Sequence, residues 1–144
     1  MTKLLPRLVA IAAATALMPS CIGFQRQWNR AEREPQRGIE GAWTGSWSSS
    51  FNGHKGKLRC VVTETAPGTY EFYYWATWAR VVSAGFRIEC EVEEKGGKWI
   101  FSGDKDLGKL GGAFSYEGTV TKGKLKATYK SDRGDTGTFE LSRP

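Results

Sequence analysis

The sequence is poor in histidine and cysteine, with one histidine and three cysteines among 144 residues. A Ser-His-Asp or Cys-His site needs a histidine beside its nucleophile, and a zinc site needs several Cys or His ligands at regular spacing. The one histidine, His54, stands between Asn52 and Lys55 in a predicted turn, and no nucleophile motif accompanies it. We therefore expect a non-enzymatic protein with no catalytic residue, no metal site and no cofactor.

The chain also lacks an apolar run that could span a bilayer, which takes about 20 apolar residues. The uncharged run from Leu8 to Met18 is shorter, follows Lys3 and Arg7, and is followed by Pro19. A basic start, a short apolar run and small residues are typical of an export signal. Residues 1–20 are therefore predicted to be a signal peptide.

Met18-Pro19-Ser20-Cys21 resembles the lipobox of bacterial lipoproteins, in which the cysteine is acylated and becomes the first mature residue. Ser20 fits this pattern, whereas Pro19 departs from it. The resemblance implies lipidation of Cys21, which would hold the protein on a membrane, in the periplasm or on an outer face. Ordinary cleavage nearby, for example after Gly23, is the alternative.

The other two cysteines, Cys60 and Cys90, form an even pair if Cys21 carries lipid. In an oxidising compartment such a pair can form a disulfide. Two buried free thiols fit the sequence equally well, so both alternatives stay open.

Charge is modest, with a formal net value of +6 that includes Lys3 and Arg7. This surplus, in an exported protein, argues against nucleic acid as a partner and favours a membrane or envelope component. Residues 21–40 are mostly polar and are predicted to be a flexible tether, with a short helix around Trp28 to Arg33 at most.

From Gly41 onward, apolar and polar residues alternate with a period of two between turn residues. This pattern predicts half-buried strands. The eight predicted strands are residues 41–49, 57–65, 69–78, a segment containing 86–92, 98–103, 113–121, 125–130 and 136–142. Short turns and the lack of a covering helix favour an all-β, antiparallel up-and-down barrel over residues 41–144, because closure removes exposed strand edges. A two-sheet sandwich is the alternative.

The Gly-Ala-Trp at Gly41 to Trp43, on the first of these strands, resembles the Gly-x-Trp that opens lipocalins and other calycin barrels. The resemblance implies a barrel closed at one end by Trp43. The chain is also similar to small exported bacterial proteins that share the Gly-x-Trp start, residues 52–59 and residues 106–118. That second resemblance implies no known activity.

Many large rings are predicted to point into the barrel, and an eight-stranded barrel has room for side chains or one small ligand. We expect a filled barrel, or a shallow pocket at one mouth. In the alternative, a lipocalin-like carrier binds a small apolar molecule in a cavity of about 300 Å³ or more. The candidate ligand-binding residues are Trp43, Trp47, Phe72, Tyr74 and Tyr116.

Tyr73 and Trp75 are predicted to point outward from the third strand, and with Trp78 they form a candidate contact surface. The alternative is that the preceding segment, through Trp28 or Ile39, lies over them. The leading hypothesis is an envelope-binding module that uses this surface, and the carrier is the alternative.

Two pairs of acidic residues are the last candidates for a functional site. Asp104 and Asp106 flank Lys105, and Asp132 and Asp135 lie near Arg133. Because each pair has a cation beside it and no calcium-loop pattern, both are interpreted as solvated turns.

Overall fold

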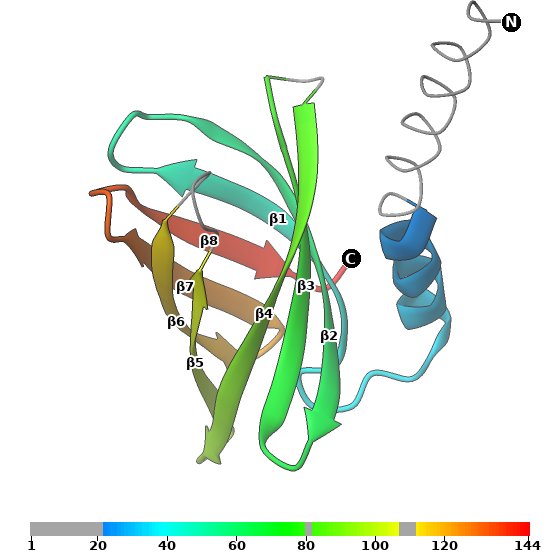
Figure 1. Ribbon diagram of the computed structural model, residues 1–144. Helices are drawn as coiled ribbons and strands as arrows, with labels where there is room; N and C mark the ends of the chain where they lie inside the picture. The colour runs from blue at the N-terminus through cyan, green and yellow to red at the C-terminus, as the bar shows by residue number, and fades with distance from the viewer. Residues whose placement is uncertain (1–21, 80–81, 107–111) are drawn as a thin grey trace, which may run out of the picture.

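The computed structural model describes residues 22–79, 82–106 and 112–144. The predicted signal peptide and the proposed lipid anchor Cys21 lie outside these ranges. The described residues form a helix at positions 22–33, beside a β-barrel (Figure 1). The strands are β1 (Gly41–Ser49), β2 (Lys55–Ala66), β3 (Thr69–Trp78), β4 (Val82–Lys95), β5 (Lys98–Asp106), β6 (Ala113–Thr121), β7 (Lys124–Ser131) and β8 (Thr136–Ser142). No helix within these ranges has the length and apolar character needed to cross a membrane.

Each strand pairs antiparallel with its neighbours in sequence, and β1 also pairs with β8. Trp47 of β1 lies opposite Phe139 of β8 in this last pairing. The predicted closed, eight-stranded, up-and-down barrel is therefore confirmed. The bounds predicted for β1, β3, β6 and β8 agree with the structure, while β4 begins earlier, because Val82 continues its pairing with Trp78.

The two ends of the barrel differ in their connections. At one end, β2–β3, β4–β5 and β6–β7 are joined by tight hairpins, and the last two have positive φ at both central residues, Gly96 and Gly97, then Lys122 and Gly123. Such turns match the twist of paired strands. At the other end lie the last residues of β1, β3, β5 and β7 and the first residues of β2, β4, β6 and β8, with the longer connections β1–β2 and β7–β8.

The hairpin end is closed by Trp43, which is only 1% exposed. Its indole Nε1 donates a hydrogen bond to the Ile39 carbonyl over 2.9 Å. Arg143 lies over the Trp43 ring and donates to the carbonyls of Ala42 and Gly38 over 3.3 Å and 2.9 Å. The chain entering β1 and the chain leaving β8 are thus bound together under this end.

The segment predicted to be a flexible tether is instead largely ordered against the barrel. Residues 22–33 form a helix beside β2 and β3 (Figure 1). Phe24 and Trp28, one helical turn apart, are buried against Ala42, Val61 and Tyr73. The prediction failed because average polarity conceals a short apolar stripe of period 3.6, and such a stripe is enough to dock a helix.

Candidate functional site

The end of the barrel with the longer connections holds a cavity of about 370 Å³. Its lining is mostly aromatic and aliphatic, and it also includes one histidine, one lysine and one aspartate. The lining residues are Trp47, His54, Leu58, Ala76, Trp78, Ala84, Phe86, Ile88, Lys105, Phe114, Tyr116, Tyr129, Asp135 and Phe139. This volume is within the range of small-molecule sites.

The expectation of a filled barrel holds for only part of the interior. Between Trp43 and Tyr74 the interior is closely packed, and these rings are 1% and 0% exposed. Nearer the mouth, Ala76 and Ala84 are register partners on β3 and β4, and both line the cavity. Two adjacent methyl side chains leave space that large residues occupy further down.

The floor of the cavity is an aromatic cluster around Tyr116. The hydroxyls of Tyr116 and Tyr74 are hydrogen-bonded to each other. The Phe139 ring centroid lies 5.7 Å from that of Tyr116 and 5.1 Å from that of Tyr74. Burial raises the pKa of Tyr116 well above its ordinary value. The Tyr116 hydroxyl is therefore neutral, and the two hydroxyls satisfy each other, which leaves an apolar, rigid floor.

One wall is fixed by Trp47. Its indole Nε1 donates to the carbonyl of Thr77 over 3.1 Å, which ties β1 to the end of β3. Between them lies Gly56, where an added Cβ would overlap the Thr77 carbonyl and lie 2.8 Å from Trp47 Nε1. Glycine at this position is what allows the bond to form across β2.

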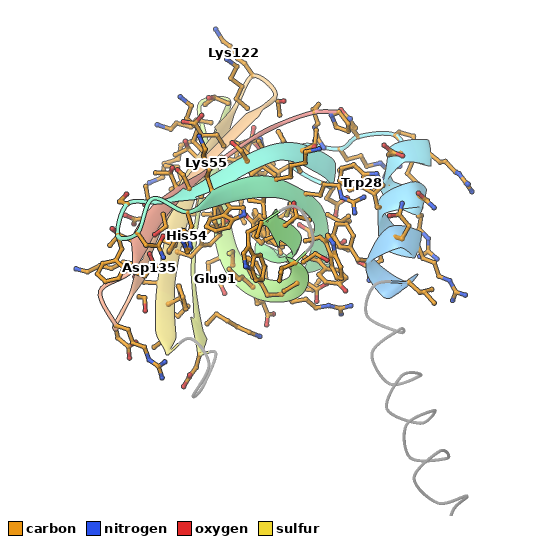
Figure 2. All side chains as sticks on the ribbon, turned by 90° about the horizontal axis from the view of Figure 1, so that it is seen from above. Trp28, His54, Lys55, Glu91, Lys122 and Asp135 are labelled. Atoms are coloured by element: carbon orange, nitrogen blue, oxygen red, sulfur yellow. The ribbon has the colours of Figure 1, made fainter. Side chains whose placement is uncertain are left out.

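The rim carries a hydrogen-bonded acid. Ser49 Oγ donates to Asp135 Oδ1 over 2.7 Å, which joins the end of β1 to the β7–β8 loop. Burial raises the pKa of Tyr129, a hydrogen bond with Ser49 lowers it, and the charge of Asp135, together with a hydrogen bond to that carboxylate, raises it again. His54 and Asp135 lie at the same end of the barrel (Figure 2). Asp135 is thus part of the cavity wall, and its interpretation as a solvated turn residue is corrected.

The predicted ligand-binding residues divide into two groups. Trp47 and Tyr116 line the cavity. Trp43, Phe72 and Tyr74 lie deeper in the core, where Phe72 packs on Phe101 with ring centroids 4.8 Å apart. Sequence reasoning placed all five on the inner face but, apart from Trp43, did not assign them to an end of the barrel.

Several residues that line the cavity were not predicted, although the direction of the strands could have identified them. The Gly-x-Trp at the start of β1 marks the closed end. Inward residues near the opposite ends of the strands, such as Phe86, Lys105 and Phe114, must then line the mouth. Lys105 was overlooked because Asp104 and Asp106, on either side of it, led to the interpretation of this segment as a solvated turn.

The predicted contact surface is not a free surface, and this hypothesis is corrected. Tyr73 is 5% exposed, and Trp75 is half-buried. Phe24 of the helix contacts both, with ring centroids 5.0 Å and 5.6 Å away. Trp78 lines the cavity, because it shares the inward alternation of Tyr74 and Ala76. The alternative in which Trp28 and its segment cover these rings describes the structure.

Cys60 and Cys90 are free and buried. Of the two alternatives, a disulfide or two buried free thiols, the structure therefore shows the free thiols. Burial raises the pKa of Cys60 well above its ordinary value and that of Cys90 to about 12. Neither lines the cavity. Protonated buried thiols are poor nucleophiles. Among the described residues, no group of three or more His, Cys, Asp or Glu side chains is placed to hold a metal ion.

Comparisons with known proteins support the fold. No protein-family model and no curated protein sequence matches the chain. A de novo designed fluorescence-activating β-barrel is similar, with a TM-score of 0.53 and 17% identity over 74% of this chain and 94% of that one. The structure of EF1p2_mFAP2b bound to DFHBI is also similar, with a TM-score of 0.53 and 14% identity over 82% of this chain and 98% of that one. A mutant of the fluorescent protein UnaG has a TM-score of 0.42 and 9% identity over 74% of this chain and 96% of that one. The first two support the closed β-barrel fold.

Proposed function

We propose that this protein is a non-catalytic carrier that binds one small, largely apolar molecule in the barrel cavity. The observation that carries the proposal is the cavity of about 370 Å³, lined mainly by rings and aliphatic side chains. Such a lining favours burial of an apolar molecule, at roughly 25 cal/mol per Å² of apolar surface. A similar barrel, EF1p2_mFAP2b, is bound to DFHBI, so this architecture can hold a small molecule.

The leading hypothesis from the sequence, an envelope-binding surface, has lost its support. It relied on Tyr73, Trp75 and Trp78, which are covered by the helix or line the cavity. The carrier needs no such surface. Residues 1–20 and Cys21 support an exported carrier anchored to a membrane by lipid, consistent with the small exported proteins that the sequence resembles.

A non-catalytic role is supported by the chemistry at the rim. A hydrolytic site needs a nucleophile hydrogen-bonded to a base. Ser49, a hydroxyl at this end, donates to Asp135, and that carboxylate is also hydrogen-bonded to Tyr129. These bonds tie strands together, and the Ser49 hydroxyl gives its one proton to Asp135 rather than to His54, which also lines the cavity.

The test is a fluorescence titration of the full-length protein with N-phenyl-1-naphthylamine, a neutral apolar probe. We expect saturable binding at one site per chain. Ala76→Phe should weaken it at least tenfold, because the added ring occupies the cavity, and a tenfold loss corresponds to about 1.4 kcal/mol. Ala113→Phe is the matched control, since Ala113 is exposed on β6. Absence of saturable binding, or equal affinity in the Ala76 variant, would refute the carrier.

A further inference from the structure

Lys105 is an inward-facing cation in an otherwise aromatic wall. It shares the inner side of β5 with Phe101 and Gly103, and it lies opposite Phe114 of β6 in the strand register. Both Lys105 and Phe114 line the cavity. Lysine is rarely buried without a partner, so an inward position beside an apolar cavity calls for an explanation.

The Lys105 ammonium has no ion pair or hydrogen bond within the described part of the chain. Asp104 and Asp106 stand on either side of it in the strand, and strand alternation places them on the outer face, where both are exposed. Asp135 is the acid that shares the cavity wall, and its carboxylate is hydrogen-bonded to Ser49 and Tyr129. Among the described residues, the Lys105 ammonium therefore has no direct partner, since the Asp135 carboxylate is bound by Ser49 and Tyr129.

We propose that the cavity selects an organic anion, bound with its charged group against Lys105 at the mouth and its apolar body toward Tyr116 and Phe139. This inference rests on the proposed function and adds the charge and orientation of the ligand. The long stem of Lys105 can lie along the Phe114 ring while its ammonium reaches the mouth.

The opposite orientation is disfavoured by the floor. The Tyr74 and Tyr116 hydroxyls are bonded to each other and are surrounded by rings. A carboxylate or sulfonate placed there would lose its hydration without gaining a cation, which is costly. At the mouth the same group would meet Lys105 and would keep part of its hydration, although Asp135 as well as His54 also lines this end.

Two probes with the same ring system test the inference. 8-Anilinonaphthalene-1-sulfonate is N-phenyl-1-naphthylamine with an added sulfonate. The affinities of both are measured on the full-length protein, on Lys105→Gln, and on Lys98→Gln as a control that removes an exposed charge from the same strand. Lys105→Gln should weaken the anionic probe about tenfold, the typical effect of losing a charged partner, and leave the neutral probe within about twofold.

Salt gives a second readout. In the parent protein, the affinity for the anionic probe should fall between about 20 mM and about 500 mM NaCl, and this dependence should be weaker in Lys105→Gln. Equal losses for both probes, or no loss for either, would overturn the role of Lys105 while leaving the carrier intact. If neither probe binds the parent protein, the carrier itself fails, and the inference fails with it.

Discussion

The Arg143 guanidinium lies over the indole of Trp43, with its Cζ 3.9 Å from the ring centroid. The two residues come from the last and first parts of the barrel, and the same guanidinium also donates to Gly38 and Ala42. One side chain thus joins the segment before β1, the start of β1 and the end of β8. Burial lowers the pKa of Arg143, and the stacked ring and two carbonyls offset the loss of hydration.

Arg143→Ala should reduce the free energy of unfolding by about 2 kcal/mol, the combined scale of a partly buried cation–π contact and hydrogen bonds from a charged donor. Urea denaturation followed by circular dichroism measures this. Lys126→Ala removes an exposed cation from β7 and should change stability by less than about 0.5 kcal/mol. Equal effects of the two substitutions would mean that Arg143 does not hold this end together.

Tyr116→Phe should destabilise the protein by about 1–3 kcal/mol, because it leaves the buried Tyr74 hydroxyl without its partner. The double variant Tyr74→Phe with Tyr116→Phe removes both hydroxyls and should recover part of this loss. Urea denaturation of the two single variants and the double variant gives the coupling between them. Strict additivity would contradict the hydrogen bond.

Phe24→Ala should release the N-terminal helix, since Phe24 is 1% exposed and contacts Tyr73, Trp75 and Trp28. A buried Phe→Ala change typically costs about 3–5 kcal/mol. We expect faster proteolysis between residues 34 and 38 and faster amide exchange in the helix, with the barrel strands still protected. Arg26→Ala, at an exposed position of the same helix, should leave both rates unchanged.

Stability should fall at alkaline pH. Burial raises the pKa of Cys90 to about 12, from 9.0. Above pH 9 the unfolded chain therefore releases this proton while the folded chain retains it, which favours unfolding. Each such group contributes at most about 1.4 kcal/mol per pH unit between its unfolded and folded pKa.

Urea denaturation with a reductant present, repeated from about pH 8 to about pH 11, measures this loss. Cys90→Ala lacks the group and should show a shallower slope, whatever its stability at neutral pH. A slope that is the same in both proteins would show that the Cys90 thiol does not cause the pH dependence.

The alternation of apolar and polar residues was sufficient to predict the barrel. In a strand, the side chain of a residue such as Phe72 or Ile88 lies on the opposite face of the sheet from those of the residues next to it. The cavity was harder to predict, since it depends on which small residues meet across strands. Ala76 and Ala84 are eight positions apart in sequence and become neighbours only through the β3–β4 register. The period of two in the sequence shows which face of the sheet a side chain occupies. It does not show how much volume the inward side chains leave unfilled inside the barrel.

The full length of the helix was missed for a different reason, although a short helix around Trp28 to Arg33 was expected. Phe24, Trp28 and Ala31 have helical spacing, but the residues between them are polar, and a short isolated helix is unstable in water. Its order comes from the barrel, where Arg59 lies 5.0 Å from the Phe24 ring centroid and 5.1 Å from that of Trp28. That contact joins positions far apart in the chain and leaves no local signal.

The β1–β8 pairing has a consequence for how the chain folds. All other strand pairings join consecutive strands and can form as hairpins, whereas this one bonds Ser48 to Thr138, 90 positions later. Closing so long a loop costs chain entropy before its contacts can offset the cost. Barrel closure is thus expected to be the late, slow event of folding, on the millisecond-to-second scale of β-rich domains. Until then β1 and β8 are both unpaired edges, open to pairing with another molecule.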